Sequence, residues 1–342
     1  MNLRACTLFL FALLHFAFPR SLAAPQSVTS APVASPKPAD DRVKLNVDLV
    51  LLDAQVVQRK TARIVGNLKR EDFVLREDGV QQQITQFGQD SLPLSVILLV
   101  DRGGCLDPFS NQVRQATLDA LERLKPTDEV ALMAFADTAD LIKGFRYDRR
   151  MIADALDRLP PHDENAGHCF NRAFYEAAKF MGEAGNPAGR RVIIMITGIT
   201  KSFDCHPGPS GEETRNEVLE SGAVVCGLVP ITAEQRLENG IIGGAATVAG
   251  VFKANTLSLG QLAEETGGEI FSAKAPDLDA AFSNLIDHLR NRYTIGFVSS
   301  NTKRDGTYRK LKLEVAPAIQ KREGDVVVKT RRGYKAAKGA KT

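Results

Sequence analysis

The stretch that decides the fold is LSVILLVDRGGC, residues 94–105. Its first part, Leu94–Val100, is apolar except for one serine, which is typical of a β-strand covered on both faces. Asp101 and a glycine-containing loop follow this strand. Asp107-Pro108 then supplies a helix cap and a residue suited to the first helical turn. We therefore predict a buried strand, a loop and a helix that extends to about Leu124.

The same strand-and-helix unit recurs along the central part of the chain. Apolar runs predict further strands at 128–135, 141–145, 192–197, 223–229 and 269–272. Helices are predicted at 149–159, 171–181, 212–221, 257–266 and 278–289, the last with apolar residues at spacings of three and four. Strands that alternate with helices form a mainly parallel sheet with helices on both faces. The predicted fold class is therefore α/β.

Both flanks of this central part have the pattern of β-structure. Residues 43–49 alternate between apolar and polar side chains, and short strands are predicted at 55–58, 73–77 and 82–87. After the last helix, strands are predicted at 293–298, 310–315 and 325–331. Too few strands lie on either side to form a stable sandwich alone. We therefore expect 42–91 and 291–335 to pair as one small β-sandwich, with an α/β domain, 92–290, inserted between them.

The first residues have the composition of an export signal. Arg4 precedes an apolar stretch, Thr7–Phe18, and Ser21-Leu22-Ala23 has the small residues of a cleavage site. The apolar stretch is shorter than the ~20 residues of a membrane-spanning helix, although an uncleaved anchor is the alternative. We predict a signal peptide at 1–24, a flexible linker at 25–41, and export to the periplasm or the exterior.

Composition excludes several classes of protein. Of the 342 residues, 44% are hydrophobic and 25% charged, as in globular proteins and unlike disordered or collagen-like chains. The net charge is only +3, and residues 301–342 hold 13 basic against 4 acidic residues. Aromatic residues make up 6% and tryptophan is absent, which disfavours a stacking platform for bases or glycans. We expect no nucleic-acid partner, whereas the basic tail, 336–342, could contact anionic lipid.

Several motifs resemble one known family. The central part resembles the von Willebrand factor type A domain at three places: Leu94–Asp101 before a helix, Leu262–Gly268 before a short strand, and Leu285–Tyr293 in a final helix. The flanks resemble von Willebrand A-related proteins typical of Acidobacteria, at Leu68–Phe73, Glu77-Asp78-Gly79 and Arg332-Gly333-Tyr334. This resemblance implies a Rossmann-like domain that binds protein ligands through loops at the carboxyl ends of its strands.

The resemblance also implies a metal-ion-dependent adhesion site that holds Mg²⁺. In the family the first loop reads Asp-x-Ser-x-Ser, the second loop supplies a Thr and the third an Asp. Here only Asp101 matches that pattern, and the other positions hold Gly103, Cys105, His168 and Gly198. A cysteine sulfur is a poor ligand for Mg²⁺, and the neighbouring Arg102 adds positive charge. We therefore predict a degenerate site without Mg²⁺ and expect no cofactor.

Three cysteines lie on loops that this fold would bring to one end of the sheet: Cys105, Cys169 and Cys205. In an oxidising compartment two of them are expected to form a disulfide, and the sequence leaves all three pairings open. Cys226 lies within a predicted apolar strand and is expected to be a buried free thiol.

Two alternatives use the same loops. One is a soft-metal site for Zn²⁺ or Cu, with ligands drawn from Asp101, Cys105, His168, Cys169, Cys205 and His206. The other is a thiol enzyme in which Cys169 or Cys205 acts as the nucleophile beside a neighbouring histidine. We favour the disulfide, because the paired spacing of a zinc motif is missing and a disulfide would consume the thiolates.

The predicted function is protein binding without catalysis. We expect an exported module of the adhesion or scaffold type whose ligand is an unknown protein of the cell envelope or the exterior. No residue is expected to be catalytic. The residues expected to contact the ligand lie on the loops at the carboxyl ends of the strands: Asp101, Arg102, Phe109, His168, Phe170 and Phe203.

Overall fold

The computed structural model describes residues 49–89, 92–159, 166–186, 189–203, 205–232 and 256–338. The predicted signal peptide, the linker and the last residues of the basic tail lie outside these ranges. Among the described residues, no helix is both long enough and apolar enough to cross a membrane.

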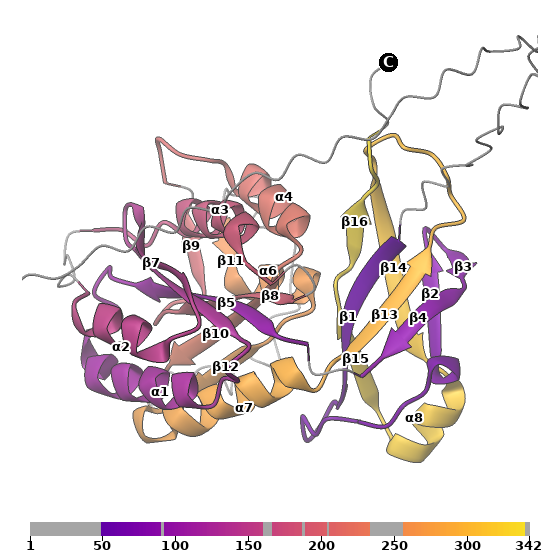
Figure 1. Ribbon diagram of the computed structural model, residues 1–342, viewed down its shortest axis with the longest axis horizontal. Coiled ribbons are helices and arrows are strands. Elements are labelled where there is room, and N and C mark those ends of the chain that lie inside the picture. Colours follow the sequence, from indigo (N-terminus) through magenta and orange to yellow (C-terminus); the bar gives the residue numbers. More distant parts are fainter. Residues whose placement is uncertain are drawn as a thin grey trace, which may run out of the picture. The chain divides into compact units, whose positions relative to one another are not determined.

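A six-stranded sheet with the strand order β12-β10-β8-β5-β6-β7 forms the centre of the α/β part (Figure 1). Its strands are β5 (Leu94–Asp101), β6 (Glu129–Phe135), β7 (Ala139–Arg146), β8 (Arg190–Ile196), β10 (Val224–Pro230) and β12 (Ile270–Ala273). All neighbours are parallel except β7, which runs antiparallel to β6 at one edge. The predicted α/β class with a mainly parallel sheet is confirmed.

Helices cover both faces of this sheet, because alternate residues of the strands belong to different cores. Val96 and Leu98 of β5 pack in one core, whereas Ile97 and Leu99 pack in the other. Figure 1 shows the two helix layers. The first contains α1 (Ser110–Glu122), α2 (Arg149–Asp157) and α7 (Leu278–Arg290), and the second contains α3 (Phe170–Phe180), α4 (Gly211–Ser221) and α6 (Leu259–Thr266).

The flanking β-structure consists of two antiparallel four-stranded sheets around a third core. The first has the order β15-β1-β13-β4, and the second has the order β16-β14-β2-β3. Their strands are β1 (Leu49–Gln58), β2 (Phe73–Glu77), β3 (Val80–Gln82), β4 (Ile84–Gly88), β13 (Tyr293–Val298), β14 (Tyr308–Val315), β15 (Val326–Thr330) and β16 (Gly333–Lys335).

In the first of these sheets, β1 lies between two strands from the other end of the chain. Leu52 pairs with Ile295 of β13, and Val56 pairs with Val328 of β15. The sequence suggested separate strands at 43–49 and 55–58, but the structure has one continuous strand from residue 49, and residues 43–48 lie outside the described part. A short helix that the pattern did not indicate, α8 (Pro317–Glu323), follows β14.

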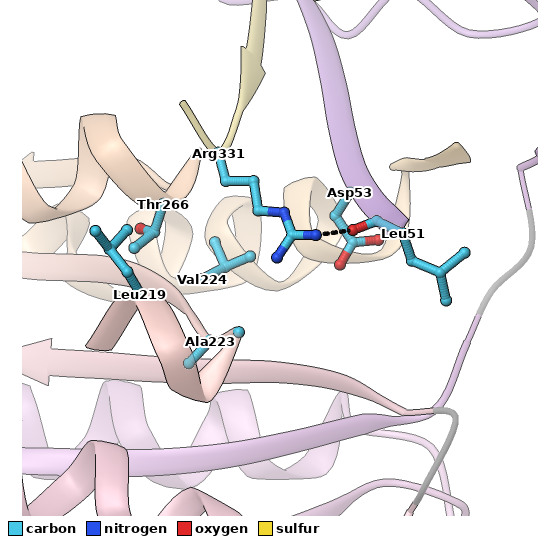
Figure 2. A pocket seen from close by; sticks show the side chains of 8 residues that line it. Leu51, Asp53, Leu219, Ala223, Val224, Thr266 and Arg331 are labelled. Carbon is cyan, nitrogen blue, oxygen red and sulfur yellow. Dashed lines mark hydrogen bonds between the residues drawn. The ribbon is translucent and has the colours of Figure 1, made fainter. Parts of the chain in front are cut away.

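The strand ends of the β-structure contact the α/β part through polar groups. Arg331 forms a β-bridge with Thr266, and its guanidinium donates a hydrogen bond to the carbonyl of Leu51 (Figure 2). The cavity beside them, which Asp53 also lines, has a volume of about 50 Å³. Leu51, Asp53 and Arg331 also line a larger open cavity of about 710 Å³, to which Arg190 and Tyr334 contribute.

Candidate functional site

Three loops meet at the carboxyl ends of the central strands. One follows β5, the second precedes α3, and the third follows β8. Because β5 and β8 are parallel neighbours, with Val100 paired to Ile196, their next residues, Asp101 and Thr197, lie side by side. A two-stranded ribbon of β9 (Lys201–Phe203) and β11 (Thr256–Ser258) continues the third loop.

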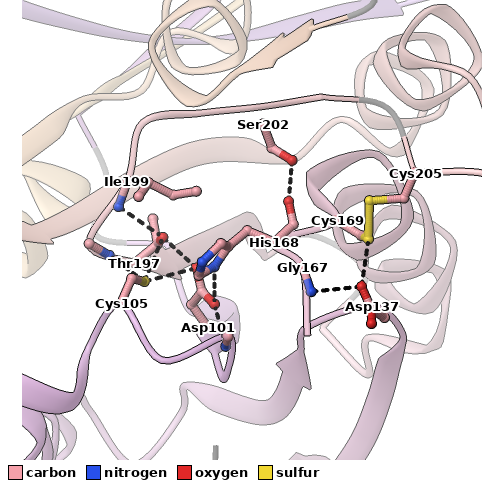
Figure 3. Close-up of polar contacts among 12 residues, drawn as sticks. Asp101, Cys105, Asp137, Gly167, His168, Cys169, Thr197, Ile199, Ser202 and Cys205 are labelled. Atoms are coloured by element: carbon pink, nitrogen blue, oxygen red, sulfur yellow. Dashed lines mark hydrogen bonds and ion pairs between the residues drawn. A yellow bond between two sulfur atoms is a disulfide. The ribbon is translucent and has the colours of Figure 1, made fainter. Parts of the chain in front are cut away.

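The carboxylate of Asp101 is the centre of this loop cluster and is 1% exposed (Figure 3). The Thr197 hydroxyl donates to its Oδ2 at 2.6 Å, and the Gly103 backbone N–H donates to its Oδ1 at 2.9 Å. The thiol of Cys105 donates to Oδ2 at 3.3 Å, and that sulfur accepts the Gly198 N–H at 3.1 Å. All three loops contribute to the network, because His168 of the second loop also contacts Asp101.

The His168 ring balances the charge of Asp101. Its Nδ1 lies 2.9 Å from each of the two carboxylate oxygens, and its side chain is 24% exposed. The hydrogen bond to Asp101, together with a contact to Cys105, raises the pKa of His168 to about 10. This value lies above neutral pH, so the ring is an imidazolium there, and the buried carboxylate has a cationic partner.

Two glycines make room for this arrangement. A Cβ on Gly103 would lie 2.6 Å from Cε1 of His168, and a Cβ on Gly198 would lie 2.6 Å from the carbonyl oxygen of Cys105. Both distances are far below a normal van der Waals contact. Larger residues at 103 and 198 are therefore incompatible with His168 and Cys105 where they stand.

The second and third loops are joined by a disulfide between Cys169 and Cys205, which are 36 residues apart in sequence. Cys169 is the residue before α3, and next to it the Asn171 side chain accepts the Cys205 N–H at 3.2 Å. The pairing that the sequence left open is thus settled, and Cys105 stays a free thiol. Cys226 is a free thiol buried in β10, as expected, and burial raises its pKa to about 11.

The structure brings together only part of the predicted soft-metal set. One donor atom each from Asp101, Cys105 and His168 lies within 4.8 Å of the others. Cys169 and Cys205 are used in the disulfide, and His206 is exposed. The disulfide also removes the two cysteines proposed as nucleophiles, so the thiol-enzyme hypothesis is wrong for Cys169 and Cys205.

The structure corrects two of the predicted ligand contacts. Phe109 is 8% exposed and packs in the core beside α1. Phe170 is fully buried, with its ring 5.8 Å from that of Phe135. Both residues lie next to loops in sequence, but their side chains point inward, so neither offers a contact surface. The side chain of Phe203 lies outside the described residues.

Arg102 stays on the loop surface but is half-buried. Its backbone N–H donates to the Phe135 carbonyl at 2.7 Å, which ties the first loop to the end of β6. Burial lowers the pKa of its guanidinium, and Asp107 and Asp101 oppose that shift.

Sequence reasoning missed two polar residues of the cluster. The Thr197 hydroxyl binds Asp101, and Asp137 accepts the Gly167 N–H at 2.8 Å, which holds the loop before His168. Their positions in the sequence could have identified both residues. Thr197 directly follows a buried strand, and Asp137 lies two residues after another. Parallel strands place the side chains at these positions along the same edge of the sheet.

The residues around Asp101 do not fit Mg²⁺. This ion prefers oxygen ligands in octahedral array at ~2.0–2.1 Å. Among the described residues, the donor atoms around the carboxylate are a hydroxyl, a thiol, an imidazole and backbone N–H groups. Both carboxylate oxygens already accept hydrogen bonds from them, so a Mg²⁺ ion would have to displace these donors.

One protein-family model matches part of the chain. The model of the family described as von Willebrand factor type A domain matches residues 96–200. No curated protein matches the chain.

Three solved structures are similar to the chain. An aerotolerance-related membrane protein from Bacteroides fragilis has 16% identity and a TM-score of 0.40, covering 57% of this chain and 98% of that one. A von Willebrand factor type A protein from Catenulispora acidiphila has 12% identity and a TM-score of 0.42, and the match covers 87% of this chain and 76% of that one. Proximal thread matrix protein 1 from the mussel byssus has 14% identity and a TM-score of 0.40, and the match covers 61% of this chain and 49% of that one.

Proposed function

The chain carries a von Willebrand factor type A-related domain, and we propose that the protein is an exported, non-enzymatic module that binds another protein without Mg²⁺. The observation that carries this proposal is the cross-linked loop cluster. Loops from three strand ends are held to one another by the hydrogen bonds to Asp101 and by the Cys169–Cys205 disulfide. A rigid set of loops on a scaffold is suited to recognition, because little order is lost when a partner binds.

The chemistry of the cluster supports binding over catalysis. The free thiol of the cluster, Cys105, is engaged in two hydrogen bonds: it donates to Oδ2 of Asp101, and its sulfur accepts the Gly198 N–H. The cysteines of the other two loops, Cys169 and Cys205, form the disulfide. The described cysteines of these loops are therefore used in holding the loops together.

The disulfide supports export. Disulfides persist in oxidising compartments and are rare where the cytosol keeps thiols reduced. The Cys169–Cys205 bridge therefore fits the signal peptide that we propose at 1–24.

The surface that we propose for docking is polar. With Phe109 and Phe170 buried, the loops present Arg102 and His168, which are half-buried, and the exposed residues Asp137 and Lys201. A polar partner surface with both charge signs would complement it.

Site-specific photo-crosslinking tests this assignment in cells that export the protein. A crosslinker at Lys201 should capture one discrete protein partner. The matched control is a crosslinker at Lys60, an exposed lysine of the flanking β-structure, which should give only background. The same products from both positions would contradict docking at the loops.

We also propose that the α/β domain, 92–290, is inserted between 42–91 and 291–335, which form one folding unit. The pairing of β1 with β13 and β15 supports this division. Limited proteolysis that releases 42–91 as a folded fragment independent of the C-terminal strands would contradict it.

A further inference from the structure

A buried carboxylate at the meeting point of three loops needs a positive partner. Asp101 is 1% exposed, and the loops can close around it only if its charge is compensated. The question is which group in this protein lies against the carboxylate.

We propose that the chain closes this site itself: the His168 ring lies on the Asp101 carboxylate and, in place of a Mg²⁺ ion, holds the three loops together. His168 is then a positioning residue whose side chain replaces an exchangeable ligand. This inference goes beyond the proposed function, because it concerns how the loops are held and not what they bind.

The first support is the contact geometry. The Nδ1 of His168 lies at the same distance, 2.9 Å, from both oxygens of Asp101, so the ring lies symmetrically against the carboxylate (Figure 3). The Thr197 hydroxyl and the Gly103 N–H occupy one further acceptor position on each oxygen. Ile199 N–H donates to the Thr197 oxygen at 3.3 Å, which leaves the hydroxyl proton for Asp101.

The second support is the set of glycines. The His168 ring occupies the space in which any side chain at position 103 would lie. The backbone of Cys105 likewise occupies the space of a side chain at position 198. The four positions that depart from the family pattern therefore fit one another in pairs, Gly103 with His168 and Gly198 with Cys105. This mutual fit is expected where one set of side chains has replaced another. It is not expected where metal ligands have simply been lost.

The third support is that His168 is held from both sides. The Ser202 hydroxyl donates to its carbonyl, and the next residue, Cys169, is fixed by the disulfide. The ring is thus delivered to Asp101 by a constrained backbone, so little conformational freedom is lost when the ion pair forms.

Thermal unfolding of the full mature chain, after treatment with a chelator, tests the proposal. His168→Asn keeps a hydrogen-bond donor but removes the ring that lies against the buried carboxylate, and we expect it to lower Tm by on the order of 10 °C. The matched control is His206→Asn, at an exposed histidine near the disulfide, which should leave Tm within about 1 °C. Equal melting temperatures for the two variants would overturn the proposal.

A double-mutant cycle tests the steric half of the argument. Gly103→Ala should lower Tm in the wild-type background, because the new methyl group displaces the His168 ring. In a His168→Ala background the same change should cost much less, since the ring is gone. An equal cost in both backgrounds would mean that Gly103 and His168 are not coupled, and would contradict the proposal.

A third measurement uses the unaltered chain and therefore decides even if the variants do not fold. Chelation should leave Tm unchanged, and millimolar Mg²⁺, Mn²⁺ or Zn²⁺ should not raise it. A saturable rise with Zn²⁺ or another of these ions would show that a metal, held by Asp101, Cys105 and His168, is the true cation.

Discussion

The two ends of the parallel sheet each bury an aspartate, and they satisfy it differently. At the carboxyl end, Asp101 binds the ring of His168 and hydrogen-bond donors from loops. At the amino end, Asp128 is fully buried just before β6 and forms an ion pair with Arg290 at the end of α7. It also accepts the backbone N–H of Leu94 at 2.8 Å and of Lys125 at 2.7 Å.

The difference between the two ends separates the end that stabilises the fold from the end that we propose for binding. Asp128 connects regular elements, since its partners lie at the start of β5 and the end of α7. Arginine remains charged under all ordinary conditions, so this connection is permanent. Asp101 connects loops, which need a disulfide and two glycines to take up their positions. The amino end therefore supports the fold, and the carboxyl end presents a surface.

The largest effect is expected at the amino end. Asp128→Ala leaves the partly buried Arg290 without its carboxylate and two backbone N–H groups without an acceptor, so the free energy of unfolding should fall by about 3–5 kcal/mol. Urea unfolding followed by circular dichroism measures it. Asp154→Ala, at an exposed position on α2, is the control and should change stability by less than about 0.5 kcal/mol. Similar values for both variants would contradict the role assigned to the amino end.

A smaller effect is expected when the disulfide is removed. The double change Cys169→Ser and Cys205→Ser should lower the free energy of unfolding by about 2–4 kcal/mol, because the cross-link no longer restricts the unfolded chain. Peptide mapping of the unreduced protein should show this one cross-link, with Cys105 and Cys226 as free thiols. A cross-link that includes Cys226 would be incompatible with its burial in β10.

The smallest effect is expected from Mg²⁺, which should leave the thermal stability of the wild-type protein unchanged. An ion present at a hundred times its dissociation constant would stabilise the folded state by ~2.7 kcal/mol, which a thermal melt detects easily. A clear saturable rise in Tm with Mg²⁺ would remove the distinction between the two ends, because the carboxyl end would then be an ordinary cation site.

Much of the α/β part was predicted from the sequence. Leu94–Val100 is a buried strand whose apolar side chains pack against one or the other of two helix layers. A continuous apolar run is the local sequence pattern of such a strand, so it could be predicted. The closing helix was placed within a residue of its observed end, Arg290, because its apolar stripe is also a local pattern. The departure from the family's loop pattern could be recognised for the same reason, since it depends only on the residue types at Gly103, Cys105, His168 and Gly198.

Sequence alone thus determined the alternation of strands and helices and the chemical identity of the loop residues, because both depend only on residues that are close together along the chain. The tertiary structure decided what depends on distances across the fold. In the folded protein, Cys205 is the disulfide partner of Cys169. The side chains of Phe109 and Phe170 lie in the hydrophobic cores, and the Thr197 hydroxyl binds Asp101. The approach of Thr197 to Asp101 follows from the pairing of the parallel neighbours β5 and β8. The disulfide and the two buried phenylalanines depend on how loops and helices pack on the sheet, which also joins residues far apart in sequence.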